Sequence, residues 1–304
     1  MSSSERLLII GATGQLGTDL VRAAAAAGVD HVGAGHEDID VTEADSVAAG
    51  MARYRPTIVI NTAALHRVDA CEDDPHQAYR VNTVGALLVA RAAAQVAART
   101  VHISTDYVFS GDKPPPPAAD GRLTPETAWV EDDPVRPLNV YGASKAAGEQ
   151  AVRLADRRHL IVRVSSLFGV VPPRNKGANF IEAILKKARA GEALRVVSDQ
   201  WITPTYTVDA ARAIVRLALS DVGGVVHVAS CDGCTWHVLA TEALRLVGLA
   251  TTVEAVAAST YYSKAPRVRN GALHTGRLAS LLGRPLRPWR EAVAAYLVEK
   301  GHLR

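Results

Sequence analysis

Three glycines near the start of the chain constrain its fold more than any other feature. They stand in the segment Gly11-Ala-Thr-Gly14-Gln-Leu-Gly17, which directly follows the apolar run 7–10 and opens a stretch typical of a helix. Glycine allows a tight turn and a close approach of backbone amides to a pyrophosphate, and the N-terminus of the following helix favours negative charge. The position between a strand and a helix therefore predicts a dinucleotide-binding turn, with a tight turn that binds no ligand as the alternative.

Short apolar runs alternate with helical stretches over the first half of the chain. We expect strands at residues 7–10, 31–34, 57–60, 101–104 and 160–164. We expect helices between them at residues 15–27, 43–53, 76–98 and 139–155. Alternation of this kind is typical of βαβ units with right-handed crossovers. It predicts an α/β fold with a Rossmann-type, doubly wound parallel sheet.

The alternation is less regular after Ser165. We expect helices at 180–189, 207–219, 236–247 and 288–299, and a strand at 225–228. These patterns predict a dinucleotide-binding domain over residues 1–165, to which segments near 205–230 return. Residues 166–304 are then a smaller C-terminal α/β lobe that binds the substrate. The proline-rich segment 113–127 is predicted to be a loop, because proline lacks the donor that a helix or central strand requires, and to border the substrate.

Composition argues against several other classes of protein. The net charge of +3, from 34 basic and 31 acidic residues, gives no electrostatic reason to expect nucleic acid or a membrane surface as a partner. No window reaches the roughly 18 to 20 uninterrupted apolar residues of a membrane span, and the first residues lack the apolar stretch of a secretory signal. We therefore expect a cytoplasmic protein. The oligomeric state is not given by the sequence, which leaves a homodimer open.

The three cysteines fit a reducing compartment. Cys231 and Cys234 form a single CxxC pair, and His237 is the one further ligand type nearby. A structural zinc site needs four such ligands. We therefore expect reduced thiols and no metal site.

Tyr141 and Lys145 form a YxxxK pair within the expected helix 139–155. A spacing of four residues places both side chains on one helix face. A free tyrosine has a pKa of about 10, and a lysine cation beside it favours the phenolate and lowers that pKa. The pair then suits general-acid catalysis, in which tyrosine protonates a carbonyl oxygen as hydride arrives at carbon. An ordinary surface helix is the alternative, and the glycine turn earlier in the chain argues against it.

Polar residues follow the expected strand 101–104, at the end where parallel sheets bind their ligands. We expect the hydroxyl of Thr105 to hydrogen-bond the substrate oxygen, with Ser104 facing away or supporting it. Asp106 is expected to bind a sugar hydroxyl, or otherwise to cap a turn.

The end of the second expected strand bears on the choice of nicotinamide cofactor. Enzymes that prefer NAD usually carry an acid there for the ribose hydroxyls, but this chain reads Val32-Gly-Ala-Gly-His36. This favours NADPH, or use of both NADPH and NADH, with His36 facing a 2′-phosphate. The residues expected to bind the cofactor are Gly11, Thr13, Gly14, Gln15, Leu16, Gly17, His36, Asp40, Val41, Ala63, Ala64, Tyr141 and Lys145.

Several segments, spread over nearly the whole chain, match the pattern of one known family. They are Gly11-Ala-Thr-Gly-Gln-Leu-Gly17, Val68-Asp-Ala-Cys-Glu72, Ser104-Thr-Asp-Tyr-Val-Phe109, Pro137-Leu-Asn-Val-Tyr-Gly142, Asp199-Gln-Trp-Ile-Thr-Pro204 and Thr235-Trp-His237. In these segments the chain resembles the dTDP-4-dehydrorhamnose reductases, which are extended short-chain dehydrogenases acting on nucleotide sugars.

The resemblance implies an NAD(P)H-dependent reduction of the C4 ketone of a nucleotide-linked deoxy sugar. The most similar reaction converts dTDP-4-dehydro-L-rhamnose to dTDP-L-rhamnose. The resemblance makes Tyr141 the proton donor, Lys145 its electrostatic partner and Thr105 the hydrogen-bonding hydroxyl. The sugar-pocket residues are Val68, Asp69, Thr105, Asp106, Tyr107 and Ser166.

Three departures from the family pattern leave the sugar undecided. Ser166 stands where the family commonly has a tryptophan near the nucleotide, and Val268 stands where it usually has a proline. The proline-rich segment 113–127 is longer than is usual in the family. A dehydratase would need a glutamate where Tyr107 follows the Thr-Asp pair. Another nucleotide-sugar epimerase or reductase remains an alternative. So does a non-catalytic binding protein like the regulatory subunit of methionine adenosyltransferase, which shares the fold.

Overall fold

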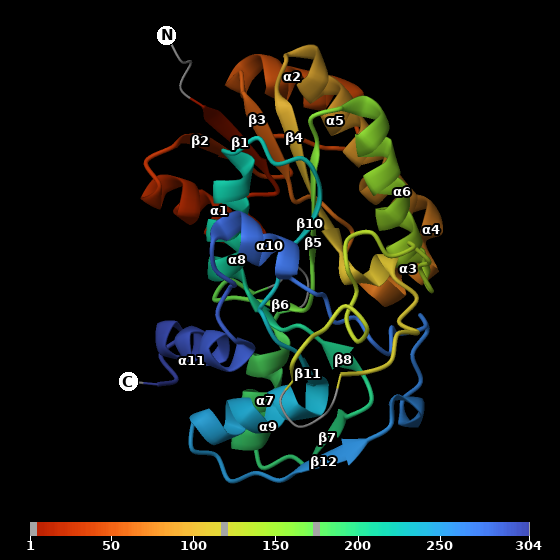
Figure 1. The fold of residues 1–304 in the computed structure, drawn as a ribbon, viewed down its shortest axis with the longest axis vertical. Helices are drawn as coiled ribbons and strands as arrows, with labels where there is room; N and C mark the ends of the chain where they lie inside the picture. Colours follow the sequence, from red (N-terminus) through yellow and green to blue (C-terminus); the bar gives the residue numbers. More distant parts are fainter. Residues whose placement is uncertain (1–4, 117–120, 173–176, 304) are drawn as a thin grey trace.

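A six-stranded parallel sheet forms one half of the molecule (Figure 1). The computed structural model describes residues 5–116, 121–172 and 177–303. The strands of the sheet, in spatial order, are β10 (Gly224–His227), β5 (Leu160–Val164), β4 (Arg99–Thr105), β3 (Ile58–Asn61), β1 (Arg6–Ile10) and β2 (Asp30–Ala34). The predicted α/β fold with a parallel sheet is therefore confirmed.

Both faces of the sheet are covered by helices, so a strand can be apolar on both of its sides. Successive side chains of a strand point to opposite faces. In β1, Leu7 and Ile9 accordingly join the core on one face, while Leu8 and Ile10 join the core on the other. This explains why the strand is a continuous apolar run and not an alternating one.

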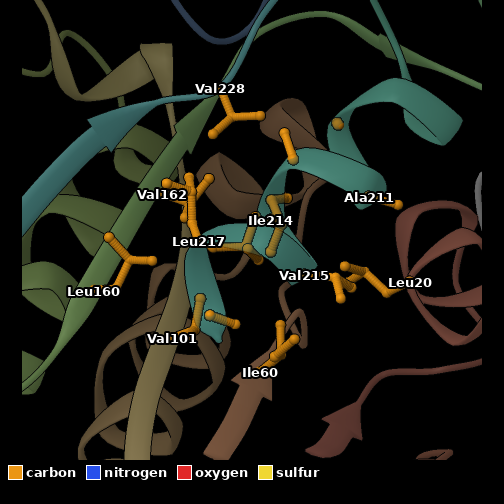
Figure 2. Close-up of a cluster of buried hydrophobic side chains, with 14 of the residues drawn as sticks. Leu20, Ile60, Val101, Leu160, Val162, Ala211, Ile214, Val215, Leu217 and Val228 are labelled. Carbon is orange, nitrogen blue, oxygen red and sulfur yellow. The ribbon is translucent and has the colours of Figure 1, made fainter. Parts of the chain in front are cut away.

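Three helices form the core on the first face of the sheet. They are α1 (Gln15–Ala26), α8 (Thr207–Ala218) and α10 (Gly276–Leu282). Figure 2 shows Ile214 of α8 on the side of Val162 of β5, and Val215 of α8 toward Leu20 of α1. Helix α8 packs closely along α1, so a segment from the second half of the chain covers the first βα unit.

On the second face the helices are α2 (Ala44–Tyr54), α5 (Ala86–Gln95) and α6 (Val140–Ala155). The single helix expected over residues 76–98 is divided in the structure. It consists of α4 (Pro75–Tyr79), a π-helical turn, η1 (Arg80–Gly85), and α5. The side-chain amide of Asn82 explains the division, because it points inward and donates to the carbonyl of Leu65 and to the hydroxyl of Ser144. A further short helix that was not predicted, α3 (Val68–Asp73), precedes this region.

The other half of the molecule, lower in Figure 1, has its own apolar core. Its helices are α7 (Phe180–Arg189), α9 (Trp236–Leu246) and α11 (Trp289–Glu299). Three strand pairs accompany them: β6 (Leu167–Phe168) with β9 (Thr205–Tyr206), β7 (Leu194–Val197) with β12 (Val253–Val256), and β8 (Trp201–Ile202) with β11 (Cys234–Thr235). Two 3₁₀ turns complete the elements, η2 (Asp106–Val108) and η3 (Ala258–Thr260).

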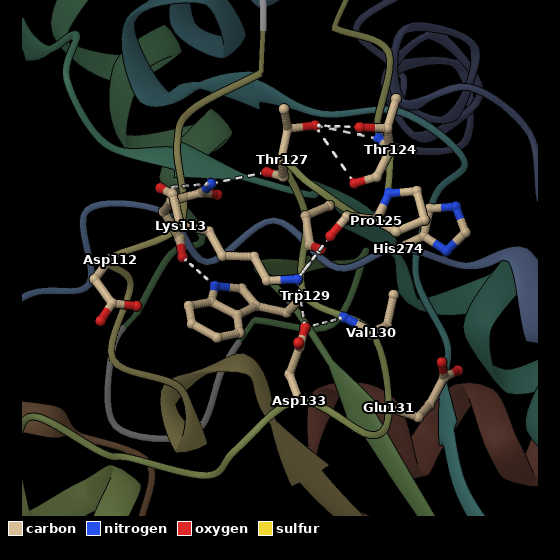
Figure 3. A network of polar contacts seen from close by, with 12 residues as sticks. Asp112, Lys113, Thr124, Pro125, Thr127, Trp129, Val130, Glu131, Asp133 and His274 are labelled. Atoms are coloured by element: carbon tan, nitrogen blue, oxygen red, sulfur yellow. Dashed lines mark hydrogen bonds and ion pairs between the residues drawn. The ribbon is translucent and has the colours of Figure 1, made fainter.

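The proline-rich segment 113–127 contains no helix or strand within its described residues, and residues 117–120 lie outside them. Lys113 links the two ends of the segment by polar contacts, as Figure 3 shows. Its ammonium donates to the carbonyls of Pro125 at 2.7 Å and Ala128 at 3.0 Å and pairs with Asp133 at 2.5 Å. The same ammonium lies 5.2 Å from the ring centre of Trp129, which gives a cation–π contact.

None of the described helices is both long enough and apolar enough to cross a membrane.

A buried ion pair joins Arg163 of β5 to Glu149 of α6. The Arg163 guanidinium donates to both carboxylate oxygens of Glu149 at 2.8 Å, and each side chain is 1% exposed. Ser104 of β4 donates to the same carboxylate at 2.6 Å. One carboxylate thus holds β4, β5 and α6 together.

We predict that Glu149→Ala lowers the free energy of unfolding by about 3–5 kcal/mol, because it leaves a buried guanidinium without its partner. Urea unfolding followed by circular dichroism measures the change. Glu242→Ala is the control, since it removes an ion pair to Arg245, whose side chain is 66% exposed, and should cost less than about 1 kcal/mol. Equal losses in the two variants would contradict the prediction.

Candidate active site

The glycine turn between β1 and α1 has the geometry of an anion-binding helix start. Gly11 has a φ of +81°, and a β-carbon at Gly17 would lie 2.1 Å from the carbonyl oxygen of Gly11. Glycine is therefore required at both positions. No side chain caps the N-terminus of α1 at Gly14, so the first amides of the helix have no side-chain acceptor. A turn of this kind fits a pyrophosphate.

The other residues predicted at the turn differ in what they expose. Thr13 is exposed, whereas Leu16 is 7% exposed and packs in the core. Leu16 therefore offers a ligand its backbone and not its side chain. Gln15 reaches into the other half of the molecule, where its amide donates to the carbonyl of Val171 at 3.1 Å.

The remaining predicted cofactor residues follow β2 and β3, the neighbours of β1: His36, Asp40, Val41, Ala63 and Ala64. His36 is exposed, and Val41 is buried in the core between the sheet and helices α2 and α5. The Asp40 carboxylate accepts from the backbone and hydroxyl of Thr42 at 2.9 and 2.8 Å, and the backbone bond is the main cause of its lowered pKa. The carboxyl ends of β1, β2 and β3 thus form one edge that these residues line.

Tyr141 lies in the first turn of α6, directly above the end of β4. The amide of Asn139 fixes the start of this helix by accepting from the backbone of Gly142 at 2.8 Å. The Tyr141 phenol lies beside the side chain of Thr105. Burial raises the pKa of Tyr141, and the neighbouring Thr105 side chain opposes that shift. The ring of Tyr107 packs edge-on against it, with centroids 5.6 Å apart.

Lys145 lies one turn further along α6 and is 2% exposed. Its ammonium donates to the backbone carbonyl of Ile103 at 2.6 Å and lies 3.3 Å from Nε2 of His102. Burial lowers the pKa of Lys145 to about 8, and the charge of Glu149 opposes the shift. The i,i+4 spacing places Tyr141 and Lys145 on one helix, but the ammonium is directed at the strand backbone beneath them.

Asp106 is buried beneath Thr105, at 4% exposure. One carboxylate oxygen accepts from the hydroxyl of Thr105 and the other from Ser165, each at 2.9 Å. Burial raises its pKa to about 6, against the effect of these two bonds. Both oxygens, which we expected to meet a sugar hydroxyl, are thus occupied by neighbouring side chains in this structure.

The other predicted sugar-pocket residues are Val68, Asp69, Tyr107 and Ser166. Val68 and Asp69 stand in α3, and the Asp69 carboxylate accepts from the Arg267 guanidinium at 2.5 Å. Burial raises the pKa of Tyr107 to about 12, and the nearby Arg267 guanidinium opposes that shift. Ser166 follows β5 with a φ of +45°, a conformation that is strained for serine.

Two residues at this site were not among those predicted from the sequence. Ser165 directly follows β5, the strand next to β4, and its partner Asp106 is 59 residues away in the sequence. Arg267 comes from the segment before α10 and meets Asp69 across a separation of 198 residues. A hydroxyl at the end of an adjacent strand was a usable signal for Ser165; no local pattern indicates the position of Arg267.

Among the described residues, no three His, Cys, Asp or Glu side chains converge in a way that could hold a metal ion.

The parallel sheet, its glycine turn and the tyrosine–lysine helix above β4 define the class of the extended short-chain dehydrogenases. The family described as the RmlD substrate binding domain matches residues 5–301. The chain belongs to this family, and the resemblance stated from the sequence is confirmed.

Curated relatives match over nearly their whole length. The spore coat polysaccharide biosynthesis protein SpsK of Bacillus subtilis (strain 168) is 37% identical over 295 residues, which cover 97% of this chain and 98% of that protein. The dTDP-4-dehydrorhamnose reductase of Escherichia coli (strain K12) is 32% identical, with 96% of this chain and 97% of that protein covered.

Solved structures of related enzymes have the same fold. The dTDP-4-dehydrorhamnose reductase of Bacillus anthracis str. Ames, in complex with NADP, superimposes with a TM-score of 0.87 at 31% identity, covering 98% of this chain and 100% of that one. The UDP-glucose 4-epimerase of Thermus thermophilus, at 18% identity and a TM-score of 0.77, covers 97% of this chain and 99% of that one and shares the fold alone.

We predict that Gly17→Ala weakens the binding of NADPH at least tenfold. The added methyl group would collide with the Gly11 carbonyl and push α1 away from the turn. Fluorescence titration of the folded variant measures the affinity. Gly28→Ala is the control: its φ is +66°, but no atom lies within 4 Å of the added carbon, so it should strain the backbone locally and leave the affinity unchanged. Parental affinity in Gly17→Ala would contradict the role of the turn.

Proposed function

We propose that this protein reduces the C4 ketone of a nucleotide-linked deoxy sugar with NADPH or NADH. The reaction is most like the conversion of dTDP-4-dehydro-L-rhamnose to dTDP-L-rhamnose. The observation that carries the proposal is the position of the Tyr141 phenol beside Thr105 at the carboxyl end of β4, the edge where the glycine turn also lies. The names of the relatives from Escherichia coli and Bacillus anthracis support the same reaction.

The residues of the glycine turn fit a nicotinamide dinucleotide. The uncapped start of α1 provides amides for its pyrophosphate, and Gly11 and Gly17 let the backbone approach closely. When bound, the reduced nicotinamide supplies a hydride to the ketone carbon. We propose that NADPH is preferred over NADH, because no acid ends β2 and exposed His36 follows it.

Tyr141 is proposed to be the general acid. As the ketone gains hydride its oxygen becomes strongly basic, and the phenol proton passes to that oxygen. Thr105 holds the oxygen beside the phenol. Lys145, a cation below its pKa of about 8, supports the phenolate that remains and contributes to cofactor binding.

The sugar is proposed to lie against Val68, Asp69, Tyr107 and Ser166, with Asp106 supporting Thr105 from below. This places the nucleotide sugar between the dinucleotide-binding domain, 1–165 with the segments near 205–230, and the lobe over 166–304. Arg267, already paired with Asp69, adds a cation at this position, which suits a substrate with a diphosphate. We also propose a cytoplasmic location, because the near balance of charges gives no reason to expect a membrane surface as a partner.

The direct test mixes the purified protein with NADPH and follows the nicotinamide absorbance as each of several nucleotide-linked 4-keto sugars is added. Consumption of NADPH with dTDP-4-dehydro-L-rhamnose supports the proposal. A shift between epimers without NADPH consumption would instead support an epimerase. Failure with every such sugar, together with tight binding of a protein partner, would support the non-catalytic regulatory alternative.

We predict that Tyr141→Phe retains its affinity for NADPH and loses turnover by about 10²–10⁴-fold, the usual contribution of a general acid. The ring and its packing against Tyr107 are kept, and only the proton is removed. Steady-state kinetics and cofactor titration measure the two effects. Turnover like that of the parent would exclude Tyr141 as the acid.

We predict that Lys145→Ala weakens both NADPH binding and turnover. In the parent protein kcat/KM should fall as the pH rises through about 8, because the buried ammonium then loses its charge. Lys145→Ala should lack this fall. Normal cofactor binding together with an unchanged pH profile in the variant would reject the role of Lys145.

A further inference from the structure

A line of polar side chains runs inward from the proposed acid. The Tyr141 phenol lies beside Thr105, the Thr105 hydroxyl donates to one oxygen of Asp106, and the other oxygen accepts from Ser165. Thr105, Asp106 and Ser165 are 6%, 4% and 1% exposed, so the line lies inside the protein. The pattern of residues predicted a role for Asp106 toward the sugar, and this inward arrangement indicates a different one.

Whether the Thr105 hydroxyl can donate to a ketone oxygen depends on where its single hydrogen is already used. A threonine hydroxyl has a single hydrogen to donate. Here that hydrogen goes to Asp106 at 2.9 Å, while the oxygen accepts from the backbone of Tyr107 at 3.2 Å. With Asp106 as a carboxylate, Thr105 therefore has no hydrogen left for a ketone oxygen. With Asp106 protonated, the acid donates to Thr105 and releases that hydrogen.

Ser165 determines which oxygen of Asp106 carries the proton. Its oxygen accepts from the backbone of Thr203 at 3.4 Å, and its hydrogen goes to Oδ2 of Asp106. While Ser165 donates to Oδ2, an acid proton on Asp106 resides on Oδ1, which faces Thr105.

The surroundings of Asp106 favour the protonated acid more than water does. The titratable groups that face it are the phenols of Tyr107 on its own turn and Tyr141 on α6. The residue that follows β5 is the neutral Ser165. The segment before α10 covers Asp106 with Gly271, where a β-carbon would lie 2.7 Å from Oδ2. In agreement, burial raises the pKa of Asp106 to about 6.

We propose that Asp106, as a carboxylic acid, is the positioning residue that turns the Thr105 hydroxyl toward the ketone oxygen of the substrate. The inference rests on the proposed reduction and adds a proton-dependent orientation step to it. No bond is formed or broken in this step apart from the hydrogen bonds, and Asp106 keeps its proton throughout. Reduction then weakens when Asp106 ionises, because Thr105 donates its single hydrogen to the carboxylate and has none for the ketone oxygen.

The test compares pH profiles of kcat/KM for the parent protein, Asp106→Asn and Ser165→Ala. The parent should lose activity as the pH rises above about 6, by about tenfold per pH unit. In Asp106→Asn the amide always donates to Thr105 and its oxygen still accepts from Ser165. This variant should lack the fall near pH 6, exceed the parent above it, and keep the separate fall near pH 8 that belongs to Lys145.

Ser165→Ala should keep the fall in activity but shift it to higher pH. The Ser165 hydrogen bond stabilises the carboxylate, so its removal raises the pKa of Asp106 and shifts the fall to higher pH. A fall near pH 6 that persists in Asp106→Asn, or a loss of activity in that variant at every pH, would overturn the inference while the proposed reduction stands.

A second measurement is independent of turnover. Asp106 binds its proton more tightly in the folded chain than at its ordinary pKa of 3.8, so its contribution to stability is complete below pH 3.8 and is lost as the pH rises through about 6. Unfolding by urea across this range should show that loss in the parent and not in Asp106→Asn. If no sugar is reduced but this difference is found, the reduction fails and the protonated acid remains. A parental profile in the variant would overturn the inference.

Discussion

The carboxylate of Glu149 is the interaction on which the geometry of the site depends. It accepts from Ser104 at the end of β4 and from Arg163 of β5, while its own backbone belongs to α6. Each of these contacts holds a residue of the proposed active site in place nearby in the sequence. Thr105 follows Ser104, Ser165 stands two residues after Arg163, and Lys145 lies one turn before Glu149. A buried charge pair is a poor source of net stability, but it is sensitive to direction and distance, so it suits the fixing of relative position.

The order of the strands brings the two halves of the chemistry together. All six strands of the large sheet are parallel, so β1, which opens into the glycine turn, and β4, which carries Thr105, present their carboxyl ends at one edge. Helix α6 crosses above β4 and sets Tyr141 there. The segment before α10 approaches the same edge from the other half of the chain and brings Arg267 against Asp69. The site is therefore assembled from pieces that only a parallel sheet places at one edge.

The sequence was sufficient for whatever depends on local pattern. The buried strands and the long amphipathic helices follow from apolar periodicity, and the glycine turn follows from its place between strand and helix. The π-helical turn at Arg80–Gly85 could not be predicted in this way, because it depends on the bonds from Asn82 to Leu65 and Ser144. The two-residue strands of the lobe are too short for periodicity to appear. The direction of the Lys145 ammonium, toward the Ile103 carbonyl, is likewise set by a strand that the helix sequence does not contain.

Desolvation governs the protonation of the whole site and favours neutral forms. Burial is the largest cause of the raised pKa values of Tyr141 and Asp106 and of the lowered pKa values of Lys145 and His102. A phenol that resists ionisation is a weak acid toward water, yet an alkoxide, whose conjugate acid is far weaker still, takes its proton readily. The proton on Tyr141 is therefore held until hydride transfer has created that base, so its transfer stabilises the transition state and not the bound ketone. Burial disfavours charged groups in this site, and it therefore couples proton transfer from Tyr141 to hydride transfer.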